Sequence, residues 1–359
     1  MSEHDQPVFP ESDVPLREFG YPDGVEHLVY AQFGLQARAE GHGPQFASQM
    51  KALFGVEDGP IRVERCHGWD AKGFHEDIMM AYWLNLDTFE RWIKSPDVVA
   101  WWDDLPEQGE VGYWREIMTP DVGRVNFAGF GLQADRLVGC THAMRAVPSD
   151  KWGYWGGYRD RFDVTSSGDQ LASDIGDELP PPVHQDTFGR RVSVAAPNNI
   201  CFVREGVVST FISSPVERAM WEAEVEPALD KWVQYLIDNP ALSGALSTRR
   251  TVEQDLETGE DLEKYSILCY FLTLRHLERA ARTQPSHLAL YNTFSGLMEQ
   301  FAAEGIVPEL QTWVDQHVLP RGALRLDYVN CHPQSGFLGF FQADEAASVV
   351  GSEIGAVTA

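Results

Sequence analysis

The stretch YAQFGLQA at residues 30–37 decides the fold, because a similar stretch, FAGFGLQA, returns at residues 127–134. In both copies apolar residues alternate with small or polar ones, a pattern typical of a strand with one buried face. A strand that recurs at the spacing of a domain predicts two similar α+β units packed as a pair, with halves at about residues 21–122 and 123–342. Chance similarity over so short a stretch is the alternative.

Local signals place helices after the strands. Residues 87–90, Asp-Thr-Phe-Glu, have the capping-box spacing, in which the first side chain accepts from the last backbone N–H. Ser95-Pro96 and Ser214-Pro215 each put a cap before a proline at the first helical position, where the missing N–H has no consequence. The helix that begins at Ser214-Pro215 should reach Asp238 and kink at Pro227, which has no N–H to donate.

Strands are expected at residues 78–83, 200–203, 265–272 and 324–329. They mix with the helices without the strict β-α-β alternation of a parallel sheet, so the sequence predicts an α+β fold with antiparallel sheet. The polar residues 1–20 indicate a loose N-terminal arm. The small residues of 343–359 indicate a flexible tail.

The composition excludes several classes of function. The 359 residues include 28 Lys and Arg against 54 Asp and Glu, a net charge of −26. Such a surface repels phosphate backbones, so no nucleic-acid partner is expected. Five scattered cysteines form no CxxC pair, which argues against a zinc ribbon or covalently attached haem. With no signal peptide and no apolar run of roughly 20 residues, we expect a cytoplasmic protein with free thiols and no membrane partner.

One histidine makes a concrete chemical suggestion. Residues 285–304 are expected to form a helix that stops at Gly305, and His287 lies near its start. Apolar residues then follow at helical spacing along one face: Leu290, Tyr291, Phe294, Leu297, Met298 and Phe301. An imidazole at the mouth of such a groove could bind the iron of a haem that lies against these side chains. A structural core histidine is the alternative.

An ordered set of motifs then resembles a known family. They are KSPDVVAWW (94–102), GYWREI (112–117), GYWGGYRDRF (153–162), NICFVREG (199–206), LERAARTQPSHL (277–288) and VNCHPQSGF (329–337). Together they resemble the aldoxime dehydratases, which form the haem-containing dehydratase family, over roughly residues 22–338. The resemblance implies one such domain at residues 21–342, with haem b as cofactor. It also implies two fused ferredoxin-like halves in a dimeric α/β-barrel-like arrangement flanked by helices, and usually a homodimer.

The implied activity is that of a carbon–nitrogen lyase of the hydro-lyase type, which dehydrates an aldoxime, R–CH=N–OH, to a nitrile. In this family ferrous iron binds the oxime nitrogen and weakens the N–O bond without net redox change. A distal acid must protonate the departing hydroxyl, and a base must remove the aldehydic hydrogen.

Two residues keep the family pattern. His287 matches the axial ligand, in a Pro-Thr/Ser-His-Leu motif, and Arg161 matches the distal arginine, the second in Arg-Asp-Arg. Tyr291 and Phe294, on the apolar face of the His287 helix, and Val314 are expected to contact the haem. For Arg161 the alternative is a surface ion pair with a neighbouring aspartate.

The remaining pocket departs from the family. Val314 stands where the family has a distal histidine, Glu205 replaces the distal serine, and Asn126 aligns loosely with a glutamate. Buried near haem, Glu205 would have a raised pKa and could donate a proton; an exposed turn glutamate is the alternative. His317 could replace the distal histidine only if its segment bulges, and His332 is expected to be a turn-forming residue.

These changes leave several functions open. In the first, the dehydratase chemistry is retained with Glu205 as proton donor. In the second, the pocket serves another haem reaction, on a different N-oxygenated substrate or with peroxide. A non-catalytic haem-binding or gas-binding protein is a third possibility.

Overall fold

The computed structural model describes residues 17–130, 138–148 and 159–345. Within these residues the strands form a single 14-stranded sheet in which every pairing is antiparallel. Their order is β14-β8-β13-β5-β2-β4-β3-β10-β11-β9-β12-β6-β1-β7. The strands are β1 (Arg17–Gly20), β2 (Val29–Ala37), β3 (Arg62–Trp69), β4 (His75–Trp83), β5 (Val111–Met118), β6 (Val125–Phe130), β7 (Arg145–Pro148), β8 (Arg191–Ala195), β9 (Ile200–Val208), β10 (Ala245–Gln254), β11 (Asp261–Phe271), β12 (Gln311–Leu319), β13 (Leu324–Val329) and β14 (Asp344–Glu345).

The helices follow the strands as the capping signals predict, with three differences, the first of which is that the Ser95 side chain makes no cap hydrogen bond. They are α1 (Gly43–Phe54), α2 (Leu86–Ile93), α3 (Pro96–Asp103), α4 (Pro215–Met220), α5 (Glu226–Asp238), α6 (Pro240–Ser243), α7 (Leu274–Thr283) and α8 (Pro285–Glu304). The cap of α2 is Asn85, whose side chain accepts from the N–H of Thr88, and not Asp87. A π turn, Trp221–Val225, occupies the place of the kink expected before Pro227.

Two units with the same connectivity make up most of the sheet. In the first unit β2, α1, β3, β4, α2–α3 and β5 follow one another, and the strand order is β5-β2-β4-β3. In the second, β9, α4–α5, β10, β11, α7–α8 and β12 follow one another, with the order β10-β11-β9-β12. The expected antiparallel α+β architecture is thereby confirmed, and β3 joins β10 to make the two units one sheet.

The repeated octapeptide does not mark equivalent strands. Its second copy begins in β6, whereas β9 is the strand that matches β2 in connectivity. β6 lies outside the second unit, between β12 and β1, and residues 131–134 fall outside the described residues. Alternation of apolar and polar residues reflects a strand with one core-facing side, a property that many strands of this sheet share.

The ends of the chain cross between the halves. β13, late in the sequence, pairs with β5 of the first unit, while β1, at the start, pairs with β6 beside the second. β1 and β14 also correct the expected arm and tail, because residues 17–20 and 344–345 form strands that pair within the sheet. The rest of the arm and tail, residues 1–16 and 346–359, lies outside the described residues. The division at about residue 122 stays a prediction.

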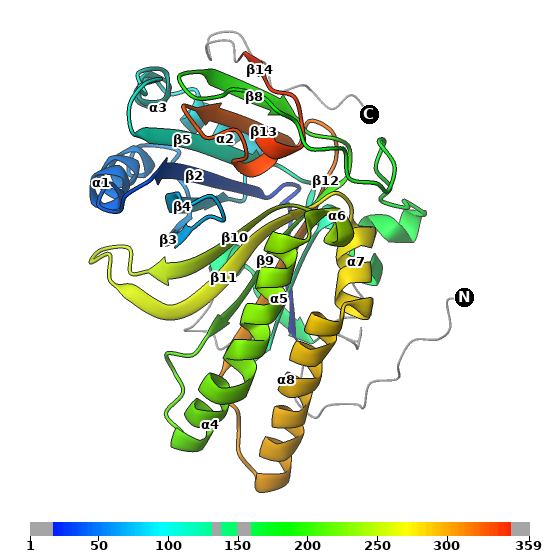
Figure 1. The fold of residues 1–359 in the computed structure, drawn as a ribbon. Coiled ribbons are helices and arrows are strands. Elements are labelled where there is room, and N and C mark those ends of the chain that lie inside the picture. Colours follow the sequence, from blue (N-terminus) through cyan, green and yellow to red (C-terminus); the bar gives the residue numbers. More distant parts are fainter. Residues whose placement is uncertain (1–16, 131–137, 149–158, 346–359) are drawn as a thin grey trace.

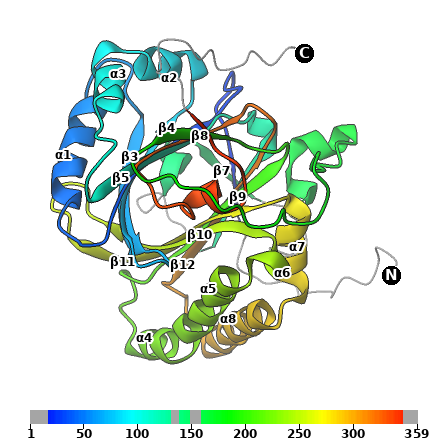
Figure 2. The ribbon, with the colours of Figure 1, turned by 45° about the horizontal axis from the view of Figure 1, so that its top comes forward.

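The sheet curls around an interior, and the helices cover its outer side (Figures 1 and 2). Helices α1–α3 pack on the first unit through an apolar cluster that includes Phe33, Trp83 and Trp92. Helices α5, α7 and α8 pack on the second unit. None of the helices in the described part of the chain is long and apolar enough to cross a membrane.

Candidate active site

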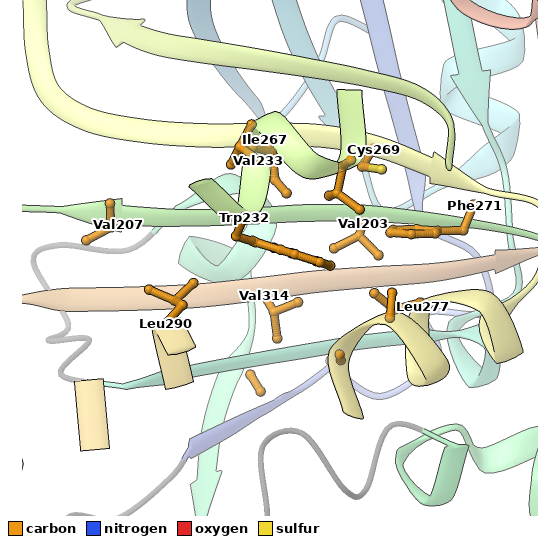
Figure 3. Packing of buried hydrophobic residues seen from close by; sticks show 14 of the residues in the cluster. Val203, Val207, Trp232, Val233, Ile267, Cys269, Phe271, Leu277, Leu290 and Val314 are labelled. Atoms are coloured by element: carbon orange, nitrogen blue, oxygen red, sulfur yellow. The ribbon is translucent and has the colours of Figure 1, made fainter. Parts of the chain in front are cut away.

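The layer between the second unit's strands and its helices is the helix-facing core. It includes Val203, Trp232, Leu277, Leu290 and Val314. Figure 3 shows Trp232 lying across the strands from α5, with Leu290 of α8 and Val314 of β12 both below it in this view. Apart from His317 and His332, the residues considered from the sequence for the site lie in this layer or next to it.

His287 occupies the first turn of α8, which begins at Pro285 and ends at Gly305 in the left-handed conformation, as predicted. The imidazole is 1% exposed, and its ring meets Trp232 edge-on at 4.7 Å between centroids. Burial lowers the pKa of His287 to about 4, even though a hydrogen bond to the backbone of Ala281 acts in the opposite direction. At neutral pH the ring is therefore uncharged, which is the state that binds a metal.

The apolar face of α8 continues from His287 along the helix. Leu290, Leu297 and Phe301 are buried, and the partly buried Phe294 packs against the same core. Tyr291 is half-buried and shares a side-chain hydrogen bond with Ser295. The helical spacing read from the sequence thus identified the face that points to the helix-facing core.

Glu205 lies inside β9, where its register neighbours are Ile267 of β11 and Val314 of β12. Its side chain shares the helix-facing side with Val203 and Val207, because alternate residues of a strand point the same way. Burial raises the pKa of this half-buried carboxyl to about 7. The alternative of an exposed turn glutamate is therefore wrong.

Val314 is 2% exposed and lies between Glu205 and Ala128 in register. The structure thus brings Glu205 and Val314 together as cross-strand neighbours. Val314 shares the helix-facing core with Trp232, and the ring of Trp232 contacts that of His287 on α8. No titratable side chain occupies the position that Val314 takes.

Arg161 ends a short 3-10 turn, Arg159–Arg161. Its side chain is 5% exposed, which does not fit a surface ion pair. The next residue, Phe162, belongs to the helix-facing core, so the turn that carries Arg161 is anchored in that layer. The first part of the GYWGGYRDRF motif falls outside the described residues.

The other two histidines considered from the sequence lie elsewhere. β12 runs without a bulge through His317, which therefore points to the interior and pairs with Asp315 at 2.7 Å. His332 is hydrogen-bonded to Asp70 at 2.5 Å and accepts from the backbone N–H of Gln334. Both its ring nitrogens are engaged, as expected of a turn-forming residue.

Sequence reasoning did not single out Gln316. It is fully buried on the same side of β12 as Val314, and in register it faces Asn126 of β6. Among the described residues neither amide atom of Gln316 has a hydrogen-bond partner, and the same holds for Oδ1 of Asn126. The available signal was strand alternation, which assigns residues 314 and 316 to one face once β12 is recognised as a strand.

The opposite face of β9 is organised differently. Arg204 points into the interior, where its terminal nitrogens meet Glu64 at 2.6 Å, Glu253 at 2.5 Å and the Tyr82 hydroxyl at 2.6 Å. Lys264 approaches Glu253 at 2.5 Å. Although burial favours a neutral carboxyl, the charges of Arg204 and Lys264 hold the pKa of Glu64 below its ordinary value. Glu205, by contrast, has no such cationic partner on its own face among the described residues.

Comparison with known proteins gives a consistent result. Residues 31–337 match the family described as haem-containing dehydratase. A phenylacetaldoxime dehydratase from Bacillus sp. (strain OxB-1) is 33% identical over 94% of this chain and 93% of its own length. An aliphatic aldoxime dehydratase from Rhodococcus globerulus is 28% identical over 88% of both chains. A crystal structure of an aldoxime dehydratase in complex with butyraldoxime superposes with a TM-score of 0.80 at 26% identity, covering 91% of this chain and 89% of that one.

Proposed function

Because the chain belongs to the haem-containing dehydratase family, we propose that it is a haem-dependent lyase that converts an aldoxime, R–CH=N–OH, to a nitrile and water. One observation carries the proposal: a neutral buried imidazole and a carboxyl with a pKa of about 7 border the same apolar layer. An apolar layer that excludes water strengthens the electrostatic effect of each polar group placed in it.

The residues of this layer fit a b-type haem. His287 would be the axial ligand, since its ring is neutral and its bond to the Ala281 backbone orients it in the way that metal-binding histidines usually are. Tyr291 and Phe294 on α8 and Val314 on β12 would line the macrocycle. When bound, ferrous haem would supply the Lewis-acidic iron that takes the oxime nitrogen and weakens the N–O bond.

The chain's own residues would move the protons. Because burial raises the pKa of Glu205 to about 7, its carboxyl can carry a proton near neutral pH and give it to the departing hydroxyl, which leaves as water. The carboxylate that remains can take the aldehydic proton, which restores the acid and balances the reaction. Arg161 would stabilise the negative charge that develops at the oxygen as the N–O bond breaks. Val314 excludes water and takes no part in proton transfer.

We further infer that the two β-α-β-β-α-β units are ferredoxin-like halves and that two copies of the chain associate as a homodimer. The matching strand orders support the first statement. Light scattering of the purified protein tests the second, and a mass of one chain would contradict it.

Reconstitution with hemin tests the proposed function directly. The loaded protein should show an intense Soret band and, under dithionite, should form nitrile from an aldoxime with saturation kinetics. His287→Ala should abolish or shift the band, whereas His332→Ala should keep it, because His332 is a buried histidine that pairs with Asp70 outside this layer. A haem-loaded protein that turns over no aldoxime would contradict the lyase and favour a haem-binding or gas-binding role.

A further inference from the structure

We propose that Gln316 and Asn126 form a two-amide subsite that binds a neutral hydrogen-bonding group on the substrate, at the far end from the reacting oxime. The inference rests on the proposed function, because it assigns the substrate class of the same site. Neither Val314 nor Glu205 performs this task.

Burial without partners is the first argument. Gln316 is 0% exposed and Asn126 is 7% exposed, yet neither amide atom of Gln316, nor Oδ1 of Asn126, has a partner among the described residues. The great majority of buried polar groups in proteins are hydrogen-bonded, because an unsatisfied one is strongly destabilising. Two adjacent amides in this state therefore point to a ligand that completes their hydrogen bonds.

Placement is the second argument. Gln316 and Asn126 are register partners on β12 and β6, and Gln316 shares its face with Val314, which is the register partner of Glu205. Glu205 and Gln316 are thus diagonal neighbours across two strands, a relation that separates such residues by roughly 7–8 Å. A substrate whose oxime lies at Glu205 would reach the amides with a substituent several bonds away.

The surroundings define the chemistry of that group. The register partners around the two amides are apolar: Val203 on β9 beside Gln316, and Ala128 and Val314 one step along the same face. No charged side chain is among these partners, so the subsite suits a neutral group. An amide offers both N–H donors and a carbonyl acceptor, which together match a hydroxyl or a carboxamide.

The test compares two oximes that differ only at the far end, hexanal oxime and 6-hydroxyhexanal oxime. Isothermal titration calorimetry of the hemin-loaded protein measures both affinities without requiring turnover. We expect the wild-type protein to bind the hydroxylated oxime more tightly. Gln316→Leu should reduce the ratio of the two affinities by about fivefold to tenfold, the factor that one net hydrogen bond supplies. Asn126→Leu should act in the same direction.

Gln32 provides a matched control. It is also 0% exposed with both amide atoms unpartnered among the described residues, but it lies on β2 and faces the interior with Tyr30. Gln32→Leu should leave the affinity ratio unchanged. Gln316→Leu and Gln32→Leu should each keep or raise the melting temperature of the hemin-free protein, because each removes an unsatisfied buried amide.

Three outcomes would overturn the subsite: an unchanged ratio in Gln316→Leu, no binding of either oxime, or a loss of haem content in that variant, which would assign the amides to haem binding. Failure of the proposed function looks different. Preferential binding of the hydroxylated oxime without nitrile formation would support the subsite and contradict the lyase. Nitrile formation with equal affinity for the two oximes would support the lyase and contradict the subsite.

Discussion

Arg204 and Glu205 are consecutive residues of β9, yet the two faces of the strand treat their charges in opposite ways. On the interior face, Arg204 has two carboxylates and a phenol at hydrogen-bonding distance. On the helix-facing side, Glu205 has Ile267 and Val314 as register neighbours, and its pKa is raised to about 7 by burial. On the interior face, ion pairs neutralise the charge of Arg204. On the helix-facing side, Glu205 keeps a proton that it can donate.

This difference separates stability from function. Removing one partner of a buried ion pair is strongly destabilising, because it leaves an uncompensated charge inside the protein. The stability of the interior network therefore depends on all of its members. A carboxyl with a perturbed pKa in an apolar layer, beside unpartnered amides, is the arrangement found where a protein binds and transforms a ligand. The comparison therefore predicts that variants of the two faces fail in different assays.

The largest effect is expected from removing Arg204. Arg204→Met removes the most deeply buried cation of the network and leaves Glu64 and Glu253 with Lys264 as the cation that they share. The change should lower the free energy of unfolding by about 3–5 kcal/mol. Urea denaturation of the hemin-free protein measures this loss. Arg204→Lys retains the charge and should lose less. If Arg204→Met unfolds at the wild-type urea concentration, the interior network is not what holds this face together.

Glu205→Gln should leave folding intact and damage catalysis. The amide cannot transfer a proton, and general acid–base groups typically contribute 10²–10⁴-fold, so we expect kcat for nitrile formation to fall by about 100-fold or more. The Soret band should keep its position and intensity. A variant with wild-type kcat would show that Glu205 is not the proton donor, and Glu205→Asp, which retains a carboxyl, should recover part of the rate.

The ends of several helices could be predicted from the sequence, because helix capping depends on residues close to one another in the chain. Ser214 accepts from the N–H of Glu217, and Gly305 stops α8 with φ of 68°, both as local rules require. Even here tertiary structure chose between neighbours, since Asn85 and not Asp87 caps α2.

The equivalence of β9 to β2 and the role of the buried amide of Gln316 could not be predicted in the same way. β9, not β6, corresponds to β2, and this depends on pairing between segments far apart in sequence. Gln316 is noteworthy only because its neighbours on β6 and β9 offer its amide no partner. The helical spacing around His287 already suggests a haem ligand, whereas Glu205 is identified only through the family resemblance. The pKa of about 7 at Glu205 depends on the strands that surround it.

The two faces should also respond to pH in opposite directions. Glu205 has a folded pKa of about 7 against 4.5 for an ordinary glutamate, so the folded state retains a proton that the unfolded state loses. Its contribution to stability therefore decreases as pH rises from about 4.5 to about 7. Glu64, whose pKa is lowered, contributes stability that is lost as pH falls below its ordinary range.

Urea denaturation of the hemin-free protein across this pH range tests the opposition. Glu205→Gln should remove the downward slope of stability between pH 4.5 and 7, while Glu64→Gln should be destabilising throughout and flatten the loss at lower pH. Parallel curves for wild-type protein and Glu205→Gln would show that the carboxyl titrates normally and would weaken its assignment as an acid at neutral pH.

The smallest effect is expected where charges pair at the exposed rim. Arg250 of β10 meets Asp230 of α5 at 2.5 Å, but the two side chains are 50% and 43% exposed. Water already solvates both groups, so Arg250→Ala should change the free energy of unfolding by less than about 1 kcal/mol. Differential scanning calorimetry of Arg250→Ala and Arg204→Met measures the stability loss of each variant under the same conditions. Similar losses in the two variants would mean that loss of a cation, and not its burial, decides the stability of this sheet.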